Sequence, residues 1–112
     1  MKQKVILVSS HALGRGNDAL GEGILETFFT LLKQKQDIPK AIFCMNSGVL
    51  TMTEQSLVSV HLQELEQRGV EVIACKTCVE AYRIEDQLVV GTVGSMNDFV
   101  ELASVFEVLT IS

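Results

Sequence analysis

The chain has one proline and no low-complexity run among its 112 residues, and 47% of its residues are hydrophobic. Disordered chains are poor in apolar residues and rich in proline and charge, so this composition indicates a folded protein. A chain of this length fits one domain and buries roughly two thirds of its unfolded surface. We therefore predict a single domain over residues 1–112 with a hydrophobic core of its own.

An excess of positive charge is also lacking. Nine Lys+Arg residues stand against fourteen Asp+Glu, which gives a formal net charge of -5. Such a chain repels phosphate backbones and anionic lipid surfaces, so we expect neither nucleic acid nor membrane as a partner. The N-terminal segment "KVILVSS" has only four strongly apolar residues, too few for a signal peptide or a membrane span. We expect a cytoplasmic protein.

Cysteine is scarce, and its number is odd. Cys44, Cys75 and Cys78 do not form the even set of a secreted disulfide framework, so we expect reduced thiols. A structural zinc site needs four ligands, usually two Cys-x-x-Cys pairs or one pair with two histidines. The chain has one pair, and His11 and His61 show no ligand spacing. We predict no metal site and no cofactor.

What the sequence does contain is a regular alternation of two patterns. Short apolar runs of the kind buried in parallel sheets predict strands at 4–10, 41–46, 70–75, 87–93 and 106–111. Apolar residues at helical spacing predict helices at 20–36, 57–65, 77–83 and 96–103. Gly69 is expected to end the second helix, and Ser95 with Asp98 to cap the last. The alternation predicts a three-layer α/β fold around a mostly parallel sheet.

In parallel sheets, functional sites form at the carboxyl ends of the strands, where loops lead into helices. The segments that follow the predicted strands should share one end of the molecule, although the sequence does not give strand order. The candidate reactive residues at this end are Cys75 and Cys78. The candidate binding residues are Gly14, Gly16, Asn46, Ser47, Gly48, Lys76, Thr77, Ser95, Met96 and Asn97.

The glycine-rich stretch "GRGNDALGEG" precedes the first helix and suggests a phosphate loop. Its spacing matches neither the dinucleotide fingerprint nor the P-loop. We favour a loop in which Asn17 or Asp18 caps the helix, and which could form a lid over the thiol site. His11 is a candidate acid or base near that site, and His61 is expected at a core edge or an interface.

The Cys75/Cys78 pair lies in "ACKTCVEAYR", where a strand feeds a helix. It could be a redox dithiol of the thioredoxin type. It could instead supply one nucleophilic thiolate, Cys78, whose pKa is lowered by the helix N-terminus and by Lys76. Both residues could also be small apolar side chains packed on the sheet, which is common for cysteine. Spacing alone leaves these three interpretations open.

Four segments resemble one known family: "GRGNDALG", "FCMNSGV", "LQELEQRGVEVIACKTCVEAYRI" and "VGTVGSMNDFVEL". In this order, from about Lys4 to Leu109, they are similar to the DsrE/DsrF-like (YchN-like) sulfur-relay superfamily, most closely to the C-terminal domain of YedF-type selenium-metabolism proteins. The resemblance implies a three-layer sandwich on a five-stranded, mainly parallel sheet, often assembled as a homotrimer or homohexamer. It also implies that one cysteine accepts a persulfide and passes it on. By position that cysteine is Cys78, with Cys75 as a second thiol.

The chain departs from this pattern in three places. Lys76 stands where related domains have glycine, and Gly94-Ser95-Met96 stands where Thr-Asn-Met is expected. The N-terminal carrier domain of YedF-type proteins is absent from the sequence, so a separate TusA-like carrier would be the partner. The resemblance implies a sulfurtransferase-like relay of sulfur or selenium between donor and acceptor proteins. From their position alone, Asn46 and Ser47 could donate hydrogen bonds to a bound persulfide or substrate, or they could shape the turn expected at 47–48. The alternatives are a non-catalytic, oligomeric small-ligand-binding module or a Cys75–Cys78 dithiol redox protein.

Overall fold

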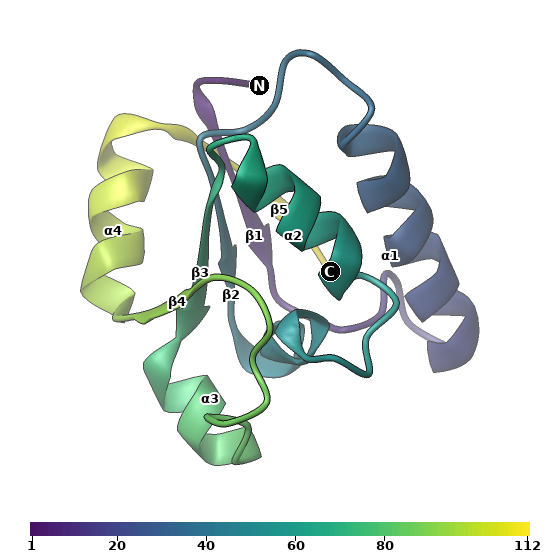
Figure 1. The fold of residues 1–112 in the computed structure, drawn as a ribbon. Helices are drawn as coiled ribbons and strands as arrows, with labels where there is room; N and C mark the ends of the chain where they lie inside the picture. The colour runs from purple at the N-terminus through teal and green to yellow at the C-terminus, as the bar shows by residue number, and fades with distance from the viewer.

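A single five-stranded sheet organises the molecule, and its strands run in the order β4-β3-β2-β1-β5 with every neighbouring pair parallel. The computed structural model describes residues 1–112 (Figure 1). The strands are β1 (Lys4–Val8), β2 (Ala41–Cys44), β3 (Glu71–Cys75), β4 (Thr92–Gly94) and β5 (Glu107–Ile111). The α-helices are α1 (Asp18–Leu32), α2 (Ser59–Gln67), α3 (Lys76–Tyr82) and α4 (Met96–Val105), and η1 (Asn46–Met52) is a 3₁₀-helix.

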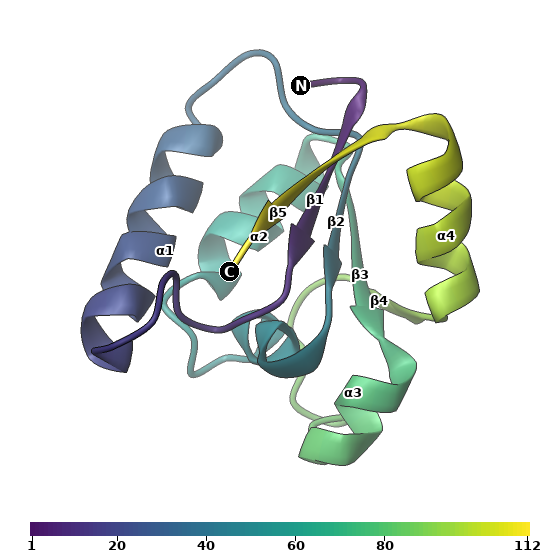
Figure 2. The same ribbon diagram turned by 180° about the vertical axis from the view of Figure 1, so that it is seen from behind.

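The helices form a layer on each side of the sheet. Helices α1 and α2 cover one face, α4 lies against the other, and α3 extends past the carboxyl end of β3 (Figures 1 and 2). The predicted three-layer α/β/α sandwich on a five-stranded sheet is therefore confirmed, with all strands parallel. No helix in the structure has both the length and the hydrophobicity needed to cross a lipid bilayer.

The apolar runs of the central strands account for the core. Side chains of β1 and β2 alternate between the two faces, so a strand buried on both sides must be apolar throughout. Toward α1 and α2, Ile6 is fully buried in a cluster that includes Phe29. On the opposite face, Phe43 packs against Phe99 of α4 with ring centroids 5.0 Å apart.

The predicted capping signals are confirmed, although the first helix ends at Leu32 and not at residue 36. Asn17 caps α1, because its side-chain oxygen accepts a hydrogen bond from the Leu20 N–H at 3.0 Å. Ser95 and Asp98 form a capping box at the start of α4. Gly69 follows α2 with a φ of 98°, a backbone conformation that glycine adopts without a Cβ penalty.

The strand predicted at 87–93 is wrong for most of its length, since β4 spans only Thr92–Gly94. The apolar residues before it pair with the end of η1 instead: the Val89 N–H donates to the Met52 carbonyl, and Leu88 forms an isolated bridge with Thr53. Gly91 then turns the chain with a φ of 76°, and a Cβ there would lie 2.4 Å from the Val72 carbonyl oxygen. Apolar residues that pair with the end of η1 thus have the same sequence pattern as a strand.

The segment after β2 also differs from expectation. The second strand ends at Cys44, not at Asn46, and the predicted turn at 47–48 is the start of η1. Gly48 allows this helix to approach β1, because a Cβ at that position would lie only 2.1 Å from the Val8 carbonyl oxygen. The helix is therefore fixed directly against the carboxyl end of the central strand.

Candidate functional site

The Cys-x-x-Cys pair lies where β3 ends and α3 begins. Cys75 is the last residue of β3 and the N-cap of α3, so Cys78 occupies the first turn of that helix. Strand β2 is the neighbour of β3, and its carboxyl end continues into Asn46. The parallel sheet therefore brings the Cys78 sulfur next to a segment 32 residues away in the sequence.

The Cys78 sulfur meets a main-chain donor. The Asn46 backbone N–H donates a hydrogen bond to Sγ at 3.0 Å. The side chain of Cys78 is half-buried, and it packs against the apolar clusters on both faces of the sheet. Its sulfur is thus held at the end of the sheet and remains partly open to solvent.

Asn46 has an uncommon backbone conformation that points to a constraint. Its φ is 50°, in the left-handed region, where asparagine is one of the few residues found regularly. The Tyr82 hydroxyl donates to its side-chain oxygen at 3.3 Å. Tyr82 was missed in the sequence, although it stands four residues after Cys78 and so lies on the same side of α3.

The electrostatic environment of Cys78 differs from the prediction. Burial raises the pKa of the Cys78 thiol, the Asn46 N–H opposes this by favouring the thiolate, and the neighbouring Cys75 thiol raises the pKa further. The net direction is upward, so the expected lowering of the pKa by the helix and by Lys76 is wrong. Desolvation of the sulfur outweighs the one hydrogen bond that stabilises its charged form.

The other two cysteines are buried. Cys75 is 5% exposed and packs with Phe43 and Ile73 under α4, and its thiol is close enough to Cys78 to raise the pKa of that thiol. Cys44 is fully buried on the other face, and burial raises the pKa of its thiol to about 12. All three thiols are free. The interpretation as core residues describes the packing of Cys44 and Cys75, whereas Cys78 is partly exposed.

Lys76 and Thr77 lie between the two cysteines, and both are exposed. Lys76 opens α3 and has no positive φ. Lysine therefore fits this backbone without strain, and the glycine of related domains is not required here.

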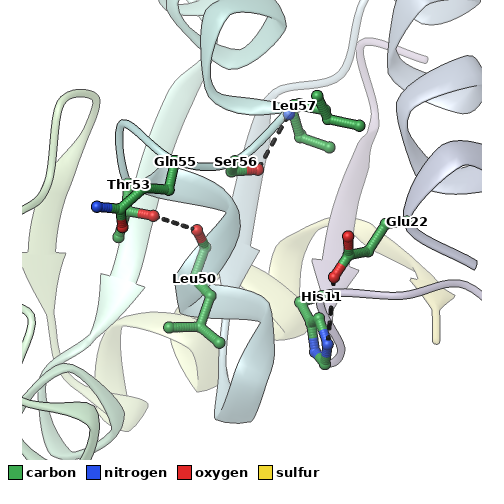
Figure 3. A pocket seen from close by; sticks show the side chains of 8 residues that line it. His11, Glu22, Leu50, Thr53, Gln55, Ser56 and Leu57 are labelled. Carbon is green, nitrogen blue, oxygen red and sulfur yellow. Dashed lines mark hydrogen bonds and ion pairs between the residues drawn. The ribbon is translucent and has the colours of Figure 1, made fainter. Parts of the chain in front are cut away.

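Ser47 is joined to the loop that follows β1. Its Oγ accepts a hydrogen bond from the His11 backbone N–H at 3.1 Å and lies 3.0 Å from His11 Nδ1. On its other side, His11 Nε2 is 3.7 Å from a Glu22 carboxylate oxygen, and both residues line a cavity of about 230 Å³ (Figure 3). Gly48 is buried against β1 and presents no group to this cavity.

The structure places the two loop glycines away from the thiols. The Gly14 N–H donates to the Ser112 carbonyl at 3.0 Å, so the loop turns toward the end of β5, whereas β3 lies on the other side of β2. Neither Gly14 nor Gly16 makes a hydrogen bond to the cysteine pair, and a Cβ at either position would meet nothing within 4 Å.

The candidate residues after β4 lie beside Cys75. Gly94 pairs with Cys75 in the sheet, so the start of α4 is close to the thiol pair. Ser95 uses its side chain to cap α4, and the Asn97 amide reaches Glu101 at 3.5 Å. Met96 is 45% exposed. These side chains are therefore occupied by helix contacts or face solvent.

No three or more His, Cys, Asp or Glu side chains come together in a way that could hold a metal ion. The chemistry available at this edge of the sheet is that of a half-buried thiol, a neighbouring thiol and a main-chain donor.

Comparison with known proteins gives a consistent picture. A sequence model of the DsrE/DsrF-like family matches residues 5–110. No curated protein sequence matches the chain. The YchN protein from E. coli superposes with a TM-score of 0.72 at 22% identity, over 98% of this chain and 99% of that one.

Two further solved structures share the fold, and both are described as proteins of unknown function. MTH1491 from Methanobacterium thermoautotrophicum superposes with a TM-score of 0.68 at 16% identity, over 96% of each chain. BT1422 from Bacteroides thetaiotaomicron superposes with a TM-score of 0.63 at 18% identity, over 97% of this chain and 95% of that one. At these identities the structural likeness establishes the fold and nothing beyond it.

Proposed function

This chain belongs to the DsrE/DsrF-like family, and on that basis we propose that it relays sulfane sulfur, or selenium, as a persulfide on Cys78. The observation that supports this most directly is the Asn46 N–H, which donates to the half-buried Cys78 sulfur at 3.0 Å. A donor at this position stabilises negative charge on the sulfur. It can stabilise the Cys78 thiolate before the sulfur is accepted, and the same thiolate again when the sulfur is passed on.

The relay conserves atoms and electrons at each step. The Cys78 thiolate attacks the outer sulfur of a donor persulfide, forms a new S–S bond, and releases the donor as a thiolate. The acceptor thiolate then attacks the same outer sulfur and releases the Cys78 thiolate. No external oxidant or reductant is consumed, because the transferred sulfur keeps its oxidation state.

Cys75 offers a second route, because it lies in the same side-chain cluster as Cys78 and raises the pKa of the Cys78 thiol. Its thiolate can attack Cys78 Sγ, which forms a Cys75–Cys78 disulfide and releases hydrosulfide. The sulfur is then reduced, and a thiol reductant must restore the pair. The same contact favours the second candidate function, a dithiol redox protein that never carries persulfide.

Persulfide loading tests the proposal. Reduced protein is incubated with glutathione persulfide and digested, and mass spectrometry locates the added sulfur atom. We expect one sulfur on Cys78 in the parent and in Cys75→Ser, and none at that position in Cys78→Ser. Because burial raises the pKa of Cys78, loading should accelerate as pH rises through the alkaline range.

Each alternative gives a different result. Absence of the extra sulfur from Cys78 would refute the carrier proposal. A reversible Cys75–Cys78 disulfide without persulfide would identify the dithiol protein. A chain that neither loads nor forms this disulfide would be the non-catalytic ligand-binding module.

The persulfide relay also requires partner proteins, and the family resemblance implies a homo-oligomer. We propose separate donor and acceptor proteins, including a TusA-like carrier, in the cytoplasm, where thiols are kept reduced. We also propose a homotrimer or homohexamer. In its support, α4 has no buried residue and exposes Val100 and Met96 on one side.

A further inference from the structure

His11 is connected to the sulfur site through Ser47. Two of its groups reach the same oxygen, because the His11 backbone N–H donates to Ser47 Oγ at 3.1 Å and Nδ1 lies 3.0 Å from it. These contacts join the loop after β1 to the first turn of η1, across 36 residues of sequence.

The contacts of the His11 ring favour one tautomer. Ser47 Oγ accepts the His11 backbone N–H, so its own proton is free to be donated to Nδ1. The other ring nitrogen, Nε2, then carries the proton. Nε2 faces the carboxylates of Glu22 and Asp18 at 3.7 and 3.9 Å, which favour that position for the proton. Figure 3 shows the Glu22 contact.

Ser47 directly follows Asn46, the residue whose N–H donates to Cys78. Asn46 needs to be held because its φ of 50° is uncommon for a residue with a side chain. Two hydrogen bonds flank it: Tyr82 holds its side chain, and His11 holds the next residue along the chain. Loss of the His11 side chain would therefore release Ser47, and the neighbouring Asn46 N–H could shift away from the Cys78 sulfur.

We propose that His11 is a positioning residue for Cys78, which acts through Ser47 and the Asn46 backbone to keep a hydrogen-bond donor on the sulfur. The inference rests on the proposed function in taking Cys78 as the working thiol. It assigns no proton transfer to His11 and no contact between His11 and the transferred sulfur.

The test is the pH profile of Cys78 alkylation by iodoacetamide, with the labelled residue identified by peptide mass spectrometry. Ser47→Ala removes the hydroxyl that accepts the His11 backbone N–H and donates to Nδ1, so we expect the pKa of Cys78 to rise and alkylation near pH 8 to slow about tenfold. His11→Ala leaves the backbone N–H in place and should slow alkylation by a smaller factor. His11→Asn should restore much of the rate, because its amide oxygen can accept the Ser47 proton.

Gln55→Ala is the matched control, since Gln55 lines the same cavity and makes no hydrogen bond to His11 or Ser47. It should keep the parent profile. Urea unfolding of each variant distinguishes a general loss of stability from a loss of positioning at Cys78. A variant that is only less stable unfolds at a lower urea concentration, while the pKa of its Cys78 stays unchanged. The Asn46 amide resonance in ¹H–¹⁵N spectra should move in Ser47→Ala and stay in place in Gln55→Ala.

Two results would overturn the inference. One is a folded Ser47→Ala variant with the parent alkylation profile and an unmoved Asn46 amide. The other is His11→Asn alkylating as slowly as His11→Ala. Both are independent of persulfide loading, so the carrier function could fail while His11 still positions the thiol, or the reverse.

Discussion

At the scale of single residues, the three thiols differ in what their sulfur atoms contact. Cys44 lies in the core with only a distant Thr51 hydroxyl, at 3.8 Å, as a polar neighbour. Cys75 is buried under α4, and Cys78 is half-exposed with a main-chain donor on its sulfur. Their order of reactivity toward a soluble alkylating reagent should follow this exposure, with Cys78 first.

Cys44 should make stability depend on alkaline pH. Burial raises the pKa of its thiol to about 12, so the folded chain keeps this proton after the unfolded chain has lost it. The stability that the protonated thiol contributes is complete below the ordinary cysteine pKa and is lost as pH rises toward about 12. We expect urea titrations between these limits to show a steeper loss of unfolding free energy in the parent than in Cys44→Ala.

At neutral pH the Cys44→Ala variant should be less stable by about 1 kcal/mol, because it loses a buried sulfur. The difference in unfolding free energy between the parent and Cys44→Ala should then become smaller as pH rises. Cys78 also has a raised pKa, but it is present in both proteins and cancels in the comparison. If the unfolding free energies of the two proteins fell in parallel as pH rises, the pKa of Cys44 would not be raised in the folded chain.

The sequence allowed part of the site to be predicted at this scale. The carboxyl ends of parallel strands meet at one edge, so Asn46 could be placed near Cys78 before the structure was known. The pKa direction could not be predicted, because it depends on how deeply the sulfur is buried among the side chains of two faces. The double contact of His11 with Ser47 also depends on a loop path that no local pattern defines.

At the scale of helices and strands, α4 depends strongly on its first turn. None of its residues is fully buried, so packing stabilises it less than the other long helices. Ser95 accepts the Asp98 N–H, and the Asp98 carboxylate accepts the Ser95 N–H. This reciprocal cap fixes the helix beside Cys75.

Ser95→Ala should therefore cost about 1 kcal/mol in unfolding free energy, measured by urea denaturation. Asn97→Ala is the control, because the Asn97 side chain is exposed and reaches only Glu101. Equal stability of the two variants would argue against the cap. Persulfide loading of Ser95→Ala adds a second answer: a normal rate means that Ser95 acts as a cap, and a lower rate means that it belongs to the thiol site.

The sequence predicted well those strands and helices whose apolar residues are the ones buried in the structure. Strands β1, β2 and β3 are apolar and lie inside the sheet, and the helix signals at Asn17 and Gly69 are confirmed. Residues 87–91 were misassigned because Leu88 and Val89 pair with the end of η1 instead of joining the sheet, and Val90 alone is buried. A burial pattern alone cannot distinguish these two cases.

At the scale of the whole molecule, the strand order determines which loops can cooperate. Because β2 separates β1 from β3, the loop after β1 reaches the thiols only through the segment after β2. The glycine-rich stretch instead turns toward β5. Strand order depends on long-range pairing, so periodicity along the chain could not show it.

The proposed assembly can be tested by sedimentation equilibrium. We expect a mass of three or six chains for the parent and a smaller one for Val100→Asp, since Val100 is 55% exposed and shares a side of α4 with Met96. Val105→Asp introduces the same charge on another side of the helix and should keep the parent mass. A monomeric parent, or an unchanged Val100→Asp, would contradict this assignment.

The donor on the Cys78 sulfur has a consequence for how relatives are compared. It is a main-chain N–H, so every residue except proline at position 46 carries the same chemical group. An alanine scan of side chains would leave that group in place and so could not detect its contact with the sulfur. Replacing the peptide by an ester, or introducing proline at Asn46, is the change that removes it.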